Sequence, residues 1–258
     1  MIWRTPKSAY FFVPPLLENI AFAELSAYRS ENRRVYNPKQ KHPVYKNAWM
    51  AGFFLTPLLL FYPLQHDSRF FSFLPSPEEL IKLGALNYNA CVFQGQWNRL
   101  ATALSLHTDI SHLFGNLFFG AIFLFLLARL TGCGRAFFLC VCAAALANFC
   151  AVIFREPGYA SVGFSTAVFA ALGLTAGIMI RRLSDQRKRF LSLAASLALL
   201  SLLGTEGVKT DYGAHIAGLI CGIFIGFLAG DRAPKFPQCV YGIAGLGFLT
   251  LPWLFALF

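Results

Sequence analysis

The chain has 258 residues, of which 57% are hydrophobic and 16% aromatic, while only 13% are charged. This composition excludes an ordinary soluble domain and predicts an all-α polytopic membrane protein. The net charge of +10 at pH 7 is therefore interpreted through the position of the basic residues relative to the membrane, and it predicts no nucleic-acid partner.

Residues 1–47 are polar and basic, and we expect them to form a cytoplasmic N-terminal arm. They lack a leading apolar segment of the signal-peptide type, because Arg4, Pro6 and Lys7 interrupt the sequence early. Within the arm, Leu16–Tyr28 fits a short amphipathic helix that lies on the membrane or on the protein. A solvated arm without that helix is an equally good interpretation.

Seven apolar segments follow the arm, and each is a candidate membrane span. The first six predict a core over residues 48–230, with a large external loop over residues 65–111. Residues 231–258 then supply a linker and a seventh, C-terminal span. The fifth segment is the shortest, at about 15 residues or roughly 22 Å of helix. The segments are Ala48–Leu64, His112–Leu130, Ala136–Phe154, Val162–Ile180, Phe190–Gly204, Gly213–Gly230 and Cys239–Phe258.

The basic residues predict the orientation of these spans. With a cytoplasmic N-terminus, 17 of the 22 Lys and Arg residues lie on the inner side and five lie outside. This bias is the one that the positive-inside rule describes. The second, fourth and sixth spans then enter from the outer face, which places His112, Ser165 and His215 near the outer ends of their helices. The same topology predicts a C-terminus on the outer side.

Ser165 and His215 are the candidate nucleophile and base, because each lies about three residues into its span. A hydroxyl is a poor nucleophile until an adjacent base takes its proton, and imidazole is the usual base. A lone serine in a membrane helix is more often a packing residue. An ionisable histidine in a span is costly, however, and is by default functional. The two residues therefore suggest a Ser-His dyad.

Glycines near the histidine favour a close approach of two spans. Gly218 and Gly222 follow His215 at i+3 and i+7 and so lie on its face, while Gly173 and Gly177 give the fourth span a matching stripe. Small residues of this kind let helix backbones come near one another. Glycine-driven packing without catalysis explains the glycines but leaves the histidine without a role.

Candidate hydrogen-bond donors for an oxyanion are also present at the same outer end of the spans. His112 and Asn116 lie at i and i+4 on one face of the second span, and the backbone N–H of Ser165 is a third candidate. The alternative is that His112 and Asn116 only form hydrogen bonds with another helix or loop.

Together these motifs resemble those of the rhomboid intramembrane serine proteases, over roughly Leu83–Gly230. The order and placement of four motifs carry this resemblance. The family's glycine-x-serine-x motif is similar to Gly163–Thr166, its HxxGxxxG motif to His215–Gly222, its HxxxN motif to His112–Asn116, and the tryptophan-arginine region of its first external loop to Gly95–Leu100, which His107 follows.

The resemblance implies a six-helix transmembrane bundle with an added seventh helix. It also implies a serine endopeptidase in which Ser165 is the nucleophile, His215 is the general base, and His112, Asn116 and the Ser165 N–H stabilise the oxyanion. Phe169 stands where the family packs an aromatic ring on the catalytic histidine. The supporting residues that it implies are Gly163, Gly218, Gly222, Arg99 and His107.

The chain departs from the family pattern at two positions in these motifs. Thr166 follows the serine where the family usually has glycine, and Trp97 lies one position before the family's tryptophan, with Asn98 next to Arg99. The retained serine and histidine favour a protease. A rhomboid-like protein that binds membrane clients without cutting them is the alternative.

A small-solute transporter fits less well, because such binding sites lie near the midplane between repeated halves and this chain has no convincing repeat. No cysteine pair or metal-ligand spacing is present, so the sequence predicts a cofactor-free enzyme without a metal. Hydrolysis needs water, so Ser165 is expected to line a wet cavity that opens outward. The expected substrates are single-pass membrane proteins, and the expected location is the lipid bilayer of a bacterial inner membrane. The sequence does not indicate an oligomeric state.

Overall fold

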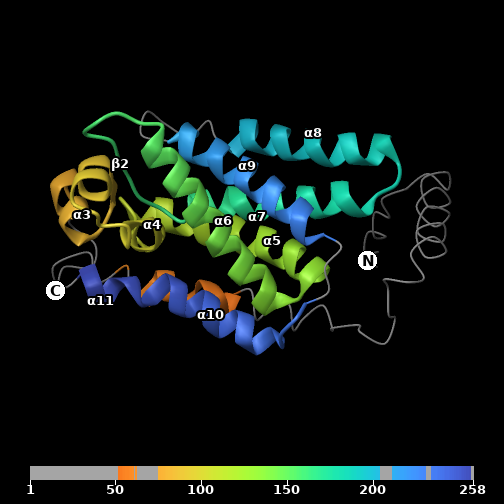
Figure 1. Cartoon of the computed structure of the whole chain (residues 1–258), viewed down its shortest axis with the longest axis horizontal. Helices are drawn as coiled ribbons and strands as arrows, with labels where there is room; N and C mark the ends of the chain where they lie inside the picture. The colour runs from red at the N-terminus through yellow and green to blue at the C-terminus, as the bar shows by residue number, and fades with distance from the viewer. Residues whose placement is uncertain (1–51, 61, 63–74, 204–210, 231–233, 257–258) are drawn as a thin grey trace, which may run out of the picture. The chain divides into compact units, whose positions relative to one another are not determined.

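The computed structural model describes residues 52–60, 62, 75–203, 211–230 and 234–256, most of which are helical (Figure 1). The predicted arm over residues 1–47, with its candidate helix Leu16–Tyr28, lies outside the described residues. So do residues 48–51, 61, 63 and 64 of the first predicted span and residues 65–74 of the predicted external loop. Residues 52–60 form a helix. The later helices are α5 (Ile110–Thr131), α6 (Cys133–Ile153), α7 (Ser165–Arg182), α8 (Gln186–Leu203), α9 (Tyr212–Ala229), α10 (Gln238–Thr250) and α11 (Pro252–Ala256).

Helix α7 lies at the centre of the described bundle. It contacts α5, α6, α8 and α9, and its contact with α9 is the most extensive in the fold. Helix α10 packs against α6, and Figure 1 shows α8 and α10 on opposite sides of α6 and α7. The core contains the fully buried side chains of Phe137, Phe164 and Ile178. Phe54 adds the helix at residues 52–60 to this core, because its ring stacks on Phe137 with a centroid distance of 4.7 Å.

Glycines on both helices allow the close contact between α7 and α9. A Cβ atom added at Gly218, Gly222 or Gly226 of α9 would lie 2.5, 2.3 or 2.4 Å from a backbone carbonyl oxygen of α7. A Cβ atom at Gly173 or Gly177 of α7 would lie 2.2 or 2.1 Å from a carbonyl oxygen of α9. Carbon atoms do not approach oxygen this closely, so the spacing of the two helices depends on the absence of side chains at these positions.

The chain before α5 folds into a compact loop that is joined to the segment before α7. Strand β1 (Leu86–Asn87) pairs antiparallel with β2 (Ala160–Ser161), with Leu86 opposite Ser161 and Asn87 opposite Ala160. The loop is thereby held beside the residues that lead to Ser165. Its other elements are α3 (Pro77–Leu83), the π-helix η2 (Asn89–Phe93), α4 (Arg99–Thr102) and the 3₁₀ helix η3 (Ala103–Ser105).

Arg99 holds this loop together from inside. Its buried guanidinium donates hydrogen bonds to the carbonyl oxygens of Ile81 and Ala85, at 2.6 and 2.9 Å, and to the side chain of Gln96 at 2.7 Å. A buried cation without such acceptors would be strongly destabilising. Arg99, which the motif comparison singles out, is thus a loop anchor that connects α3 with α4.

The all-α membrane bundle that the sequence predicts is confirmed. Helices α5, α6 and α9 are each long and apolar enough to cross a membrane, and Gln238–Leu254 is a shorter apolar stretch. Helix α7 ends with Arg181 and Arg182, and α8 begins with a basic run, which lowers the mean hydropathy of both helices. The count of seven spans therefore stays a prediction.

Three predicted segments differ from the observed helices. Helix α7 begins at Ser165 and not at Val162, because Gly163 adopts a φ of 125° that no helix accommodates. Helix α8 has 18 residues, since its basic first turn is helical too. The predicted seventh span is divided at Pro252, which ends α10 and begins α11 because proline lacks an N–H and its ring clashes with the preceding turn.

The glycine contact predicts the effect of adding one methyl group. Gly222→Ala is expected to lower the free energy of unfolding by about 1–3 kcal/mol, because its Cβ must push α7 and α9 apart. Gly115→Ala in α5 is the matched control, since a Cβ there has no neighbour within 4 Å. That control is expected to leave stability unchanged or raised by up to about 1 kcal/mol. Equal effects of the two variants on unfolding in mixed micelles would contradict the packing interpretation.

Candidate active site

Ser165 is the first residue of α7 and follows a loop that is fixed on both sides. The Gly163 N–H donates to the Ala103 carbonyl at 2.9 Å, and the Phe164 N–H donates to His107 Nε2 at 3.4 Å. The backbone N–H groups in the first turn of a helix have no acceptor within the helix and lie at its positive end. This position therefore offers the half-buried Ser165 hydroxyl together with an N–H group that suits an anion.

His112 and Asn116 lie against this loop from α5. A Cβ atom added at Gly163 would lie 2.7 and 2.8 Å from Cε1 and Nε2 of the His112 ring, and 3.5 Å from Nδ2 of Asn116. Asn116 Nδ2 is buried, and it has no hydrogen-bond partner among the described residues. A buried amide donor without an acceptor is costly and calls for a functional explanation. The structure thus places the His112 ring and the Asn116 amide next to Gly163, which precedes Phe164 and Ser165.

His215 lies in the first turn of α9, where its N–H donates to the Asp211 carbonyl at 3.1 Å. Its ring is buried and packs on Phe169, with ring centroids 4.4 Å apart and an interplanar angle of 34°. Phe169 is one helical turn after Ser165 and so lies on the same face of α7. The predicted pairing of Phe169 with the candidate base is therefore present as a ring contact.

The first turns of α7 and α9 are in direct backbone contact. A Cβ atom at Gly218, three residues after His215, would lie 2.5 Å from the Thr166 carbonyl oxygen and 3.4 Å from Phe169 Cβ. No hydrogen bond joins Ser165 to His215 within the described part of the chain. Hydrogen bonds between catalytic groups are commonly long before a substrate binds. Packing therefore brings Ser165 and His215 onto adjacent helical turns without a hydrogen bond between them.

His107 is a buried and neutral part of the site. Burial and, to a smaller extent, the neighbouring His112 lower the pKa of His107 to about 3. The two rings meet edge to face, with centroids 5.2 Å apart. Because neutral His107 accepts from the Phe164 N–H, its protonation would break the bond that holds the segment before Ser165.

Asp211 has a structural role at the start of α9 and lies outside the four motifs. Its carboxylate caps α9 by accepting from the Ala214 N–H at 3.1 Å, forms an ion pair with Arg155 at 3.0 Å and accepts a hydrogen bond from the Tyr159 hydroxyl. Arg155 also lies 5.1 Å from the centre of the Tyr159 ring. The loop after α6 is thereby connected to the turn that carries His215. An acidic residue four positions before a histidine at a helix start is the sequence signal for this cap.

A cavity of about 400 Å³ lies beside this ion pair and is separate from the candidate dyad. Residues of the loop after α6 line it, and Ser165, His215 and His112 do not. The lining residues are Phe154, Arg155, Glu156, Pro157 and Tyr159.

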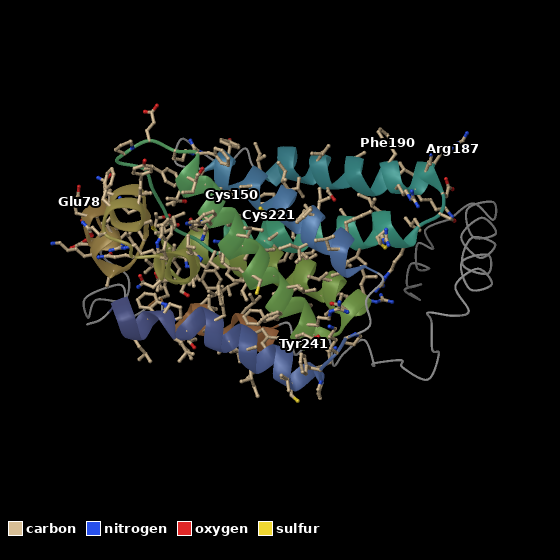
Figure 2. The ribbon with its side chains drawn as sticks, in the orientation of Figure 1. Glu78, Cys150, Arg187, Phe190, Cys221 and Tyr241 are labelled. Carbon is tan, nitrogen blue, oxygen red and sulfur yellow. The ribbon has the colours of Figure 1, made fainter. Side chains whose placement is uncertain are left out.

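Cysteine thiols serve as polar contacts between helices. The side chains of Cys150 in α6 and Cys221 in α9 lie next to one another (Figure 2). Cys140 in α6 donates to the Ala167 carbonyl of α7 at 3.1 Å. All seven cysteines are free thiols. The thiols thus join α6 to both helices that carry the candidate dyad.

A family model and several similar proteins show the family of this chain. A family model described as the Rhomboid domain matches residues 94–232, which is more than half of the chain. The chain belongs to the rhomboid family. The resemblance predicted from the motifs is thus confirmed, and the matched residues of this rhomboid include every candidate site residue named above.

Several relatives are named as rhomboid proteases. Rhomboid-like protease 1 of Toxoplasma gondii is 31% identical over 188 residues, which cover 69% of this chain and 64% of that protein. Putative rhomboid protease YdcA of Bacillus subtilis is 30% identical over 154 residues, covering 57% of this chain and 75% of that protein. Rhomboid protease GluP of the same bacterium is 31% identical over 152 residues, which are 57% of this chain and 29% of GluP.

These relationships establish an integral membrane protein of an intramembrane protease family. The aligned region covers less than two thirds of the T. gondii protein and less than a third of GluP. The activity of this rhomboid is accordingly a proposal, which its own residues have to support.

The tight fit at Gly163 predicts a specific loss of stability. Gly163→Ala is expected to lower the free energy of unfolding by about 2–4 kcal/mol, because it adds both a left-handed backbone strain and a clash with the His112 ring. Gly158→Ala is the matched control, with a φ of 94° but no atom within 4 Å of the new Cβ. Its expected cost is about 1 kcal/mol. Equal costs in mixed-micelle unfolding would mean that the His112 contact is not tight.

The lowered pKa of His107 predicts acid sensitivity. The unfolded chain protonates this imidazole near its ordinary value of about 6.5, whereas the folded chain does so only near 3. Stability that is present above about pH 6.5 is therefore lost as the pH falls, by up to about 1.4 kcal/mol per unit. His107→Gln is expected to flatten the fall in unfolding free energy between pH 6.5 and 4.5. A slope identical to that of the wild type would refute this role.

Proposed function

We propose that this chain is an intramembrane serine endopeptidase that hydrolyses a peptide bond in or near the transmembrane segment of a single-pass membrane protein. One observation carries the proposal. His112 and Asn116 of α5 lie against the Gly163 loop that leads to Ser165 at the start of α7, and His215 lies on the turn of α9 that packs against the same end of α7. Membership in a family of intramembrane proteases supports the same reaction.

In the proposed mechanism, His215 takes the proton of the Ser165 hydroxyl while the serine oxygen attacks the scissile carbonyl. The developing oxyanion accepts hydrogen bonds from the Ser165 N–H, from Asn116 Nδ2 and from the His112 ring. His215 then gives its proton to the leaving amine, and water cleaves the acyl-enzyme by the reverse sequence of proton transfers. Phe169 supports this role because its ring contact limits how His215 can turn.

The loop ahead of α5 supports a water-accessible position for this chemistry. Elements α3 and α4 belong to a polar, hydrogen-bonded structure that joins the segment before Ser165, so the nucleophile lies at the loop end of α7. A substrate helix satisfies its own carbonyl groups and must unwind before attack. We therefore propose substrates with helix-weakening residues near this end of the membrane, and a reaction that needs neither metal nor other cofactor.

The charge distribution supports an orientation. Helix α7 begins at Ser165 and ends at Arg181 and Arg182, and the first turn of α8 carries Arg187. Figure 2 shows Arg187 and Glu78 of α3 at opposite ends of the bundle. By the positive-inside rule the basic end is cytoplasmic, so the proposed site opens to the outer side and the C-terminus lies outside. A bacterial plasma membrane stays the predicted location.

The proposed function is tested with purified protein in lipid vesicles and a tagged single-span substrate. Wild-type protein is expected to release the outer fragment, whereas Ser165→Ala and His215→Ala are each expected to reduce the rate by a factor on the order of 10⁴ or more. Thr175→Val is the control, because among the described residues the Thr175 hydroxyl bonds only within α7, to the Ala171 carbonyl at 2.9 Å.

Reactivity toward a fluorophosphonate separates enzyme from client-binding protein. Labelling of wild-type protein that disappears in Ser165→Ala supports an activated serine. If the substrates stay intact and Ser165 is not labelled, the results favour a protein that binds membrane clients without cutting them. Buried Thr166, which stands where the family usually has glycine, is the sequence feature behind this alternative.

A further inference from the structure

Thr108 connects a carboxylate to the ring of His112. Its hydroxyl oxygen lies 2.9 Å from Oδ2 of Asp109 and 3.2 Å from Nδ1 of His112. The other carboxylate oxygen, Oδ1, accepts from the Ser111 hydroxyl at 2.6 Å and from the His112 N–H at 2.8 Å, which caps α5. Asp109, Thr108 and His112 therefore form a continuous chain of hydrogen bonds.

The direction of the protons in this chain follows from the charge of Asp109. Burial raises the pKa of this carboxyl, but hydrogen bonds from Ser111, from the His112 N–H and from Thr108 outweigh burial and lower it overall. Asp109 is thus ionised and can only accept. A hydroxyl has one proton, and two oxygens 2.9 Å apart repel unless a proton lies between them. The Thr108 proton therefore points to Asp109, and the Thr108 oxygen accepts from Nδ1–H of His112.

The opposite nitrogen of the His112 ring faces the nucleophile loop. A Cβ atom at Gly163 would lie 2.8 Å from His112 Nε2. Three charged or titratable groups face His112 from the elements around it. These are Asp109 at the start of α5, buried His107 from the loop, and His215 from α9. Because His107 stays neutral, it does not oppose a positive charge on its neighbour.

We propose that Thr108 is a positioning residue which, with Asp109 behind it, keeps the proton of neutral His112 on Nδ1. In that neutral form, Nε2 faces the loop before Ser165 without a proton and cannot donate a hydrogen bond. His112 then donates to an oxyanion only after it becomes an imidazolium. Asp109 compensates the charge of that imidazolium through the Thr108 hydroxyl. This proposal rests on the proposed function, in which His112 is an oxyanion donor. It adds a cation to the oxyanion site and assigns a role to a residue outside the four motifs.

Nitrogen chemical shifts of ¹⁵N-labelled histidine test the tautomer without any need for activity. The sample is the full chain in the Ser165→Ala background, and the His112 signals are those lost in a His112→Gln variant. The expected result is that neutral His112 has its proton on Nδ1, and that Thr108→Val removes this preference. A proton on Nε2 in the protein with Thr108 intact would overturn the proposal.

Activity provides a second test that a merely structural role would not satisfy. Thr108→Val is expected to lower kcat/KM about tenfold, less than the loss of an oxyanion donor, and to move the alkaline limb of the pH profile to lower pH. Thr108→Ser is expected to restore both, because it keeps the hydroxyl. Asp109→Asn retains a helix cap but removes the charge, and it is expected to move the alkaline limb of the pH profile to lower pH as well. Thr175→Val serves as the control.

The outcomes separate the two proposals. A wild-type protein that cuts no substrate would refute the proposed function, while the chemical shifts would still decide the tautomer. An active Thr108→Val variant with an unchanged pH profile would overturn the role of Thr108 and leave the protease intact. Equal losses of kcat/KM in Thr108→Val and Thr108→Ser would also overturn the role of Thr108, since they would show that its hydroxyl is not required.

Discussion

The backbone contact between α7 and α9 is the constraint on which the rest of the structure depends. Side chains normally separate two packed helices, but here glycines from both helices let the carbonyl oxygens of one approach the Cα atoms of the other. Ser165 and His215 lie in the first turns of these two helices. The distance between the backbones of these two turns is accordingly set by main-chain contacts, which cannot be relieved by a change of side-chain rotamer.

The two candidate site histidines, His112 and His215, are each positioned by an aspartate that caps their helix. Asp109 caps α5 and Asp211 caps α9, so each carboxylate satisfies free N–H groups at a helix start and lies within one turn of a histidine. Each aspartate also connects that turn to the surrounding loop, through Thr108 in one case and through Arg155 in the other. Helix capping and alignment of the site are therefore achieved by the same side chains.

The parts of the fold that depend on composition and period were predictable from the sequence. Long apolar runs specify helices, and the spacing of Gly218 and Gly222 after His215 indicates the tight helix pair. The helix start at Ser165 was not predictable from hydropathy, because Val162 and Phe164 are as apolar as the helix, and only the backbone angle of Gly163 ends the loop there. Pro252 was a visible signal for the break between α10 and α11.

The network around the site was harder to predict, since it depends on contacts between distant segments. Nothing near Tyr159 in the sequence indicates that its hydroxyl meets Asp211, 52 residues later. The role of Arg99 as a loop anchor likewise depends on carbonyl groups 14 and 18 residues earlier in the chain. Such pairs become apparent only after the helices have been packed.

The short β1–β2 ladder has a consequence for how the molecule can move. Two residues on each strand join the loop ahead of α5 to the segment that leads into α7, and the Gly163 N–H bonds to Ala103 of that same loop. The loop is therefore bonded to the segment that carries Ser165. If the loop opened while these bonds held, Ser165 would move with it relative to His215, so under the proposed function a substrate would have to enter through motion elsewhere in the bundle.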